Sequence, residues 1–151
     1  MERLTRAIDV DAPPGAVWPW LGQLREAPYS YDWLDNWGRR SPRAVNHALG
    51  EIAAGQPILS IFEVVAVTPD REFTAAIHRD GPRKLFGDVA TTYTVAPRGA
   101  DGSRIVVRLV IAQRSGPLAL ANAGLAVGDL VMMRKQLRTL KQLAEHDRVS
   151  R

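Results

Sequence analysis

The side chains that could carry acid–base, nucleophilic or metal chemistry are few and scattered in this 151-residue sequence. It contains no cysteine, which excludes a disulfide framework, a thiolate zinc site and a cysteine nucleophile. Its three histidines, His47, His78 and His146, are far apart, and zinc needs three or four convergent ligands. No nucleophile elbow, phosphate loop or other signature motif is present. We therefore predict no metal site, no cofactor and no catalytic residue, and we expect the histidines at the surface or in turns.

One acidic pair lies in the densest aromatic part of the chain. Asp32 and Asp35 are three residues apart, and such a pair is able to act as general acid and base. Near helix ends, however, aspartates more often cap the helix or face water, and we favour that interpretation. Trp33 and Trp37 would share one face of a helix, with Trp33 packing on the rest of the protein. Whether Tyr31 or Trp37 instead lines the mouth of a cavity stays open, because a buried tyrosine hydroxyl needs a polar partner.

Alternating apolar and polar residues predict a series of strands. The predicted strands are residues 4–11, 57–67, 71–78, 88–96 and 103–114, separated by turns at 68–70 and 79–82 and by a hairpin loop at 97–102. On the second of them, Phe62, Val64 and Ala66 are expected to share a face. The segment 39–55 resists assignment, and its residues 45–49 fit either a short strand or a turn of helix.

Apolar residues at helical spacing predict a short helix over residues 16–24 and a long one near the C-terminus. The short helix places Val17, Trp20, Leu21 and Leu24 on one side. The long helix is expected to start at Asp129, as its N-cap, and to end near His146. It buries Leu130, Met133, Leu137, Leu140 and Ala144 and exposes Arg134, Lys135, Arg138 and Lys141. Residues 117–127 fit either a short helix or a packed loop.

This order of elements indicates an α+β domain spanning residues 1–151. On the last strand, Ile105 and its apolar neighbours alternate with Arg104, Arg108 and Arg114, so one face of the sheet meets water. The other face must be covered, and only the last helix is long enough to cover it. We therefore predict a curved antiparallel sheet wrapped around a long C-terminal helix, with an internal apolar cavity.

The covered face carries two hydroxyl side chains, Thr91 and Tyr93. A filled core disfavours hydroxyls without partners, whereas a ligand pocket uses a few polar groups in an apolar wall. The flexible Met132 and Met133 on the facing helix would adapt to varied ligands. The alternative is a filled core in which both hydroxyls are hydrogen-bonded. The predicted pocket comprises Tyr31, Trp37, Phe62, Phe73, Ala75, Thr91, Tyr93, Leu109, Met132 and Met133.

Charge and hydropathy limit the kinds of partner that we expect this chain to bind. The net charge is +4, but the basic residues are dispersed and form no nucleic-acid-binding motif, so no nucleic acid is expected. The first residues have no apolar core of a signal peptide, and the longest apolar stretch, 117–127, is too short to span a bilayer. We expect a cytoplasmic monomer or homodimer without stable membrane insertion.

Three segments carry a resemblance to a known superfamily. They are IDVDAPPGAVWPWL at 8–21, YSYDWLDN at 29–36 and DLVMMRKQL at 129–137. With the order of strands between them, they resemble the START-like (SRPBCC) superfamily, which includes Bet v 1-like proteins, lipid-transfer START domains and bacterial polyketide cyclase/dehydrase-like proteins. The resemblance implies a helix-grip fold, in which the sheet grips the last helix and leaves a pocket. It does not fix a reaction.

Three functions fit these observations. The first is binding or carrying of a hydrophobic small molecule, such as a lipid, a polyketide or an isoprenoid. The second is a cyclase or dehydratase acting on an aromatic or polyketide substrate, with Tyr93, Asp32 or His78 as acid or base. The third is a protein-interaction domain that uses the basic face of the last helix. Ionisable groups inside the cavity would favour the second, and a filled core with a large exposed apolar patch would favour the third.

Overall fold

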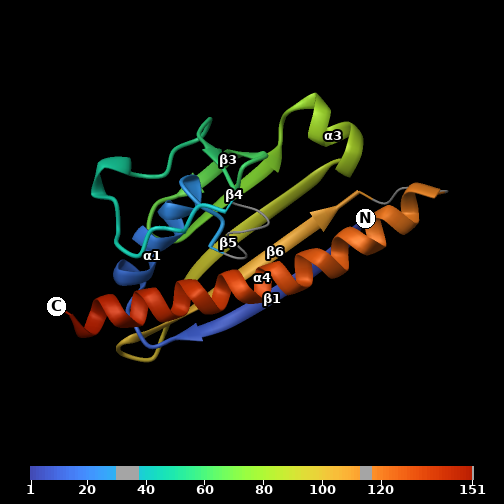
Figure 1. Ribbon diagram of the computed structural model, residues 1–151. Coiled ribbons are helices and arrows are strands. Elements are labelled where there is room, and N and C mark those ends of the chain that lie inside the picture. The colour runs from blue at the N-terminus through green and yellow to red at the C-terminus, as the bar shows by residue number, and fades with distance from the viewer. Residues whose placement is uncertain (30–37, 113–116, 151) are drawn as a thin grey trace.

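The computed structural model describes residues 1–29, 38–112 and 117–150 and orders them into one sheet and several helices (Figure 1). The elements in chain order are β1 (Glu2–Val10), α1 (Pro14–Gly22), the 3-10 turns η1 (Gln23–Arg25) and η2 (His47–Leu49), β2 (Pro57–Ile58), β3 (Phe62–Thr68), β4 (Glu72–Ile77), α3 (Asp80–Phe86), β5 (Val89–Arg98), β6 (Gly102–Ile111) and α4 (Pro117–Val149).

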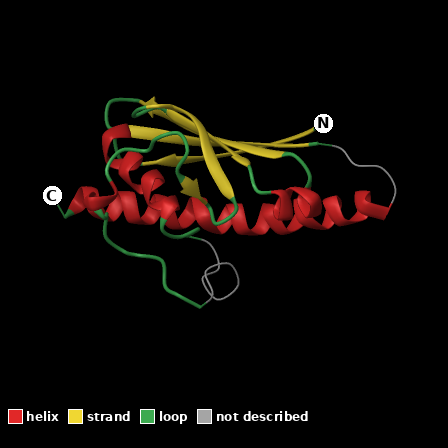
Figure 2. Cartoon of the chain, turned by 90° about the horizontal axis from the view of Figure 1, so that it is seen from above, coloured by secondary structure: helices red, strands yellow, loops and turns green. Residues whose placement is uncertain are grey.

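The six strands form one antiparallel sheet in the order β1-β6-β5-β4-β3-β2. The first strand therefore pairs with the last, and β5 and β4 lie in the middle. The strands make one layer and the long helix α4 lies across one face of it (Figures 1 and 2). The predicted α+β class and helix-grip arrangement are confirmed.

The alternation along the central strands also has the predicted result. On β6, Ile105, Val107, Leu109 and Ile111 are buried, while Arg104 and Arg108 are exposed. The pairing aligns these residues with their neighbours across the sheet. One row on the covered face contains Phe73, Tyr93 and Val107, and the next contains Ala75, Thr91 and Leu109. The period-two pattern therefore sets which side chains face α4.

Helix α1 packs into the core at one end of the sheet. Pro14 occupies its first turn, where a missing N–H costs nothing. Val17, Trp20, Leu21 and Leu24 are buried as predicted. Trp18 is buried as well, with its ring edge against Phe73 at a centroid distance of 6.5 Å. Helical spacing did not predict the burial of Trp18, because a helix that contacts both the sheet and α4 buries more than one stripe.

Two side chains organise the segment that the sequence left unassigned. Gln23 is fully buried and donates to the hydroxyl of Tyr29 and the carbonyl of Ala44, while its own amide oxygen accepts from Asn46 N. Residues 45–49 contain a helical turn, η2, and not a strand. Asn46 caps that turn by accepting from Ala48 N at 3.1 Å.

Arg25 holds the next part of the same segment. Its guanidinium donates to the carbonyl oxygens of Gly22, Leu49, Gly50 and Glu51 and to the amide oxygen of Gln56, at 2.7–3.0 Å. Burial lowers the pKa of this guanidinium, and the nearby Glu51 and Glu26 oppose the shift. All five acceptors are uncharged groups of the helix end and the following segment, so this arginine ties the loop to the helix.

The prediction for the start of the last helix was wrong. Helix α4 begins at Pro117, so residues 117–127 are helical and Asp129 lies inside the helix. Gly124 and Gly128 each cost only about 1 kcal/mol relative to alanine in a helix, and the leucines and alanines around them favour helix. Leu130 lies outside the described side chains. Met133, Leu137, Leu140 and Ala144 are buried as predicted.

The run 57–67 is not one strand. Leu59 and Ser60 have φ values of 50° and 66°, which turn the chain between β2 and β3. A β-bulge then shifts the register between Val64 and Ala66. Val64 is buried but Ala66 is exposed, so their predicted shared face was wrong, because one extra residue reverses the alternation.

The predicted turn at residues 79–82 was also wrong, since helix α3 begins within it. Pro82 fits the first turn of a helix, where its missing N–H would have no intrahelical partner.

Candidate functional site: a cavity between the sheet and the long helix

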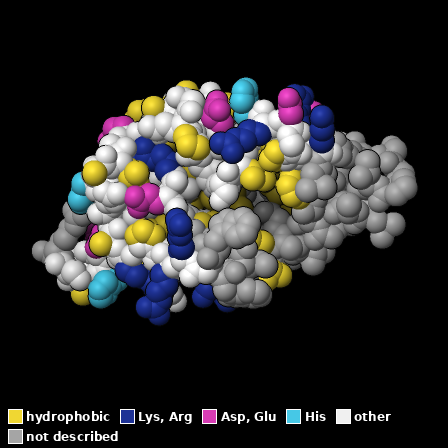
Figure 3. Space-filling view, turned by 45° about the horizontal axis from the view of Figure 1, so that its top comes forward, with side chains coloured by type: hydrophobic (Ala, Val, Ile, Leu, Met, Phe, Trp, Pro, Cys, Tyr) yellow, Lys and Arg dark blue, Asp and Glu magenta, His cyan; other side chains and the backbone are white. Residues whose placement is uncertain are grey.

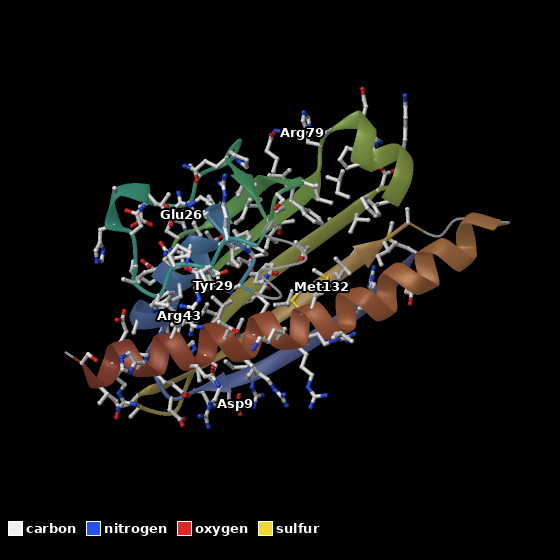
Figure 4. The ribbon with its side chains drawn as sticks, viewed as in Figure 1. Asp9, Glu26, Tyr29, Arg43, Arg79 and Met132 are labelled. Carbon is white, nitrogen blue, oxygen red and sulfur yellow. The ribbon has the colours of Figure 1, made fainter. Side chains whose placement is uncertain are left out.

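A cavity of about 240 Å³ lies between the covered face of the sheet and α4. Strands β5 and β6 form its floor, α4 forms one wall, and the turn before β3 forms another. The residues that line it are Pro28, Leu59, Ser60, Ile61, Phe62, Thr91, Tyr93, Leu109, Met132, Met133 and Gln136. Met132 lies on the stretch of α4 that crosses the sheet (Figure 4). Hydrophobic side chains gather near the middle of the face seen in Figure 3, beside the undescribed residues.

The turn before β3 is hydrogen-bonded to η1, the helical turn that follows α1. Leu59 N donates to the carbonyl of Leu24 in η1 at 3.0 Å, and Ile61 N donates back to Leu59 O at 2.8 Å. These bonds stabilise the left-handed conformation of Leu59 and Ser60, which few residues other than glycine adopt readily. The wall that they form is therefore set by a long-range contact.

Tyr93 is fully buried and hydrogen-bonded within the protein. Its hydroxyl donates to the amide oxygen of Gln136 at 2.7 Å and lies 3.7 Å from the Met133 sulfur. Its ring stacks on Phe73 with centroids 5.0 Å apart and planes 10° from parallel. Gln136 in turn donates from Nε2 to the carbonyl of Pro28 at 2.6 Å. A chain of two hydrogen bonds thus joins β5 to α4 and α4 to Pro28.

Thr91 differs from Tyr93 in this respect. It is 2% exposed, and its hydroxyl oxygen is buried in the cavity wall with no hydrogen-bond partner. The adjacent Thr92, on the outer face of the sheet, shares a hydrogen bond of 2.9 Å with Thr74. Leaving a buried hydroxyl without a partner costs about 1–3 kcal/mol. Thr91 therefore carries an unmet hydrogen-bonding capacity at the cavity.

The described lining contains no aspartate, glutamate, histidine, lysine or arginine. A cluster of ion pairs lies instead where the end of β1, which carries Asp9, meets α4 and β6 (Figure 4). There the hydrogen bond from Arg104 lowers the pKa of Asp9. Burial alone would raise the pKa of Glu145, but hydrogen bonds from Asp11 N and Lys141 outweigh it, so this pKa is lowered. This charged cluster fastens the helix to the first strand.

The structure brings together six of the ten predicted pocket residues: Phe62, Thr91, Tyr93, Leu109, Met132 and Met133. Phe73 and Ala75 are not among the lining residues, and Phe73 packs between the rings of Trp18 and Tyr93. Tyr31 and Trp37 lie outside the described residues. So do the other members of the aromatic segment singled out above, Asp32, Trp33 and Asp35.

The sequence reasoning missed five lining residues. Gln136 had a signal, because it lies one helical turn from Met132 and Met133 and is a polar residue on an apolar face. Leu59, Ser60 and Ile61 had none, since residues 57–67 were interpreted as one strand, and Pro28 lies outside every predicted element. His47, His78 and His146 are exposed, as expected. Within the described ranges, no three acidic or histidine side chains cluster in a way that would hold a metal ion.

The comparisons with known proteins fit this architecture. The family model described as polyketide cyclase / dehydrase and lipid transport matches residues 1–145. No curated protein sequence matches the chain. Among the described helices, none has the length and apolar character needed to cross a bilayer.

Solved structures share the fold at low identity. Protein MLL2253 from Mesorhizobium loti is 17% identical with a TM-score of 0.57, over 96% of this chain and 98% of that one. Protein CV1439 from Chromobacterium violaceum is 17% identical with a TM-score of 0.55, over 95% and 96%. The Aha1 dimer from Colwellia psychrerythraea is 15% identical with a TM-score of 0.52, over 96% and 97%.

Proposed function

Because the chain belongs to the polyketide cyclase / dehydrase and lipid transport family, we propose that it binds one small hydrophobic molecule in the cavity between β5, β6 and α4. The observation that carries this proposal is the composition of the wall. It consists of apolar side chains with a few hydroxyl and amide groups and, among the described residues, no charged one. Such a wall is typical of sites for small organic ligands.

The size of the cavity favours a compact ligand. Its volume of about 240 Å³ lies just below the usual range for ligand pockets, roughly 300–1,000 Å³. It exceeds a cavity of about 150 Å³, which is large enough to hold benzene. A two-ring aromatic molecule or a short isoprenoid fits this space, whereas a two-chain lipid does not. Of the ligands considered from the sequence, small polyketide-like and isoprenoid-like molecules are therefore preferred.

The two alternative functions receive less support from the described residues. Of the two described residues considered as acid or base, Tyr93 lines the cavity with its hydroxyl already donating to Gln136, and His78 is exposed. Asp32 lies outside the described residues. Among the described residues, the exposed large hydrophobic side chains are few: Met1 beside β1, Val65 on β3, and Val131 and Val149 on α4. A large exposed apolar patch would have favoured the interaction domain.

The test is binding of an uncharged hydrophobic fluorophore, N-phenyl-1-naphthylamine, to the purified chain, together with native mass spectrometry of protein isolated from its own host. Leu109→Phe fills the cavity floor and is expected to weaken fluorophore binding at least tenfold. Val110→Phe is the matched control, because the next residue of β6 faces the other side of the sheet. Equal binding by both variants, or no binding by the unmodified chain, would contradict the proposal.

We also propose that the chain works in the cytoplasm as a monomer or a homodimer, without inserting stably into membranes. Light scattering coupled to gel filtration distinguishes the two oligomeric states. Fractionation of host cells tests the compartment, and recovery in the membrane fraction after a high-salt wash would count against it.

A further inference from the structure

The unpartnered hydroxyl of Thr91 indicates what kind of ligand the cavity takes. Thr91 lines the cavity, and its hydroxyl oxygen is buried with no hydrogen-bond partner among the described residues. Of the other polar side chains in the lining, Tyr93 bonds to Gln136 and Gln136 to Pro28, while Ser60 is exposed to solvent. Thr91 is thus the buried lining group whose hydrogen bond a ligand is positioned to complete.

The remaining wall restricts the charge of that ligand. A carboxylate or ammonium group brought into the cavity would lose its hydration and find no opposite charge among the described lining residues. A pure hydrocarbon would avoid this cost but would leave the Thr91 hydroxyl unpaired in a dry site. A neutral oxygen satisfies both conditions, because a threonine hydroxyl donates to a carbonyl or hydroxyl oxygen and also accepts from a hydroxyl.

We propose that the ligand is uncharged and that one hydroxyl or carbonyl oxygen of it bonds to Thr91 Oγ1 while its apolar body lies among Phe62, Leu109 and Met132. This inference rests on the proposed function and adds the ligand's polar chemistry to it. Phenols, enolised or ketonic small polyketides and terpene alcohols belong to this class.

Three probes that share the naphthalene ring distinguish a hydrocarbon ligand, a neutral oxygen-bearing ligand and a charged ligand. They are naphthalene, 2-naphthol and 2-naphthoate, used at neutral pH, where only 2-naphthoate is ionised. Each is titrated into the chain and its Thr91→Val variant by competition with N-phenyl-1-naphthylamine. Valine keeps the shape of threonine and removes the hydroxyl. We expect Thr91→Val to weaken 2-naphthol binding about tenfold, the usual effect of losing one buried hydrogen bond, and to leave naphthalene binding unchanged or stronger. We expect 2-naphthoate to bind at least tenfold more weakly than 2-naphthol.

The matched control is Thr92→Val, whose side chain lies on the outer face of the sheet. It should change the affinity of none of the three probes. Equal weakening of naphthalene and 2-naphthol by Thr91→Val would mean that Thr91 acts through shape, and tightest binding of 2-naphthoate would mean a charged ligand. Either result overturns this inference and leaves the proposed function standing. Failure of all three probes to bind would overturn both.

Thermal unfolding of the ligand-free variants provides a second, independent test. Because the Thr91 hydroxyl has no partner, its removal should leave the melting temperature unchanged or raise it. Thr92→Val should lower the melting temperature slightly, since it breaks the bond to Thr74. A clear fall in the melting temperature of Thr91→Val would show that the hydroxyl has a structural partner, which overturns the inference.

Discussion

The hydrogen bond between Tyr93 and Gln136 links the sheet to α4, and its contribution can be measured by a double-mutant cycle. Gln136→Leu removes the acceptor of the Tyr93 hydroxyl and the donor to Pro28 O, at 2.7 and 2.6 Å. Loss of one buried hydrogen bond costs about 1–3 kcal/mol, so we expect this variant, which loses two, to lose about 3 kcal/mol of unfolding free energy. Tyr93→Phe leaves one acceptor unpaired and is expected to cost about 1.5 kcal/mol.

The double variant is the informative member of the cycle. Once Gln136 is a leucine, the Tyr93 hydroxyl has lost this bond, so its removal costs little more. The double variant should then lose about 3 kcal/mol in place of the additive value of about 4.5 kcal/mol, a coupling of about 1.5 kcal/mol. All three variants should still fold, because domains of this size are usually stable by about 5–15 kcal/mol.

Urea unfolding followed by circular dichroism measures these free energies, provided that the m-value, the slope of unfolding free energy against urea concentration, is the same for all variants. Thr92→Val combined with Gln136→Leu is the control cycle, because Thr92 lies on the outer face of the sheet. That pair should be additive within about 0.5 kcal/mol. If the Tyr93 and Gln136 variants are additive within the same limit, the bond does not stabilise the contact between the sheet and α4.

Three further predictions concern other parts of the fold. Gly102→Ala should destabilise the protein by about 1–3 kcal/mol, because a Cβ there would lie 2.7 Å from Arg98 O. At Gly15 in α1 a Cβ would meet no atom within 4 Å, so Gly15→Ala should stabilise the protein by up to about 1 kcal/mol. Urea unfolding of the two variants measures both changes in free energy. The pKa of Glu145 is lowered in the fold, so its contribution is complete above the ordinary glutamate value of about 4.3 and is lost as the pH falls through the lowered pKa. Glu145→Gln should therefore flatten the acid side of the pH–stability profile, and an unchanged profile would contradict the assignment. Arg25→Lys should speed hydrogen exchange of the amides in residues 47–51, since a lysine cannot reach five acceptors at once; unchanged exchange would show that the loop is held by other contacts.

The alternation of apolar and polar side chains in the sequence determined which residues of the central strands are buried. Strand β6 and the buried face of β5 follow directly from alternation, because each successive side chain must point to the opposite face. The buried stripe of α4 follows in the same way from helical spacing. These local periods also placed Thr91, Tyr93, Met132 and Met133 on the surfaces that enclose the cavity.

Features that depend on distant contacts were not predictable from these periods. The turn at Leu59 and Ser60 is stabilised by the carbonyl of Leu24, and the bulge after Val64 by the strand that pairs with it. Neither leaves a clear mark in the local residue types. The start of α4 at Pro117 was missed for a different reason, because two glycines indicate a break that the rest of the segment overrides.

The roles of Thr91 and Tyr93 show the same division. Their positions on the covered face follow from the sequence, and so does the expectation that their hydroxyls need partners. Only the tertiary structure decided that Tyr93 meets Gln136 of α4 while Thr91 meets no protein group. The physical reason is that hydrogen-bond satisfaction depends on distances of about 3 Å between residues far apart in the chain, which alternation along one strand does not specify.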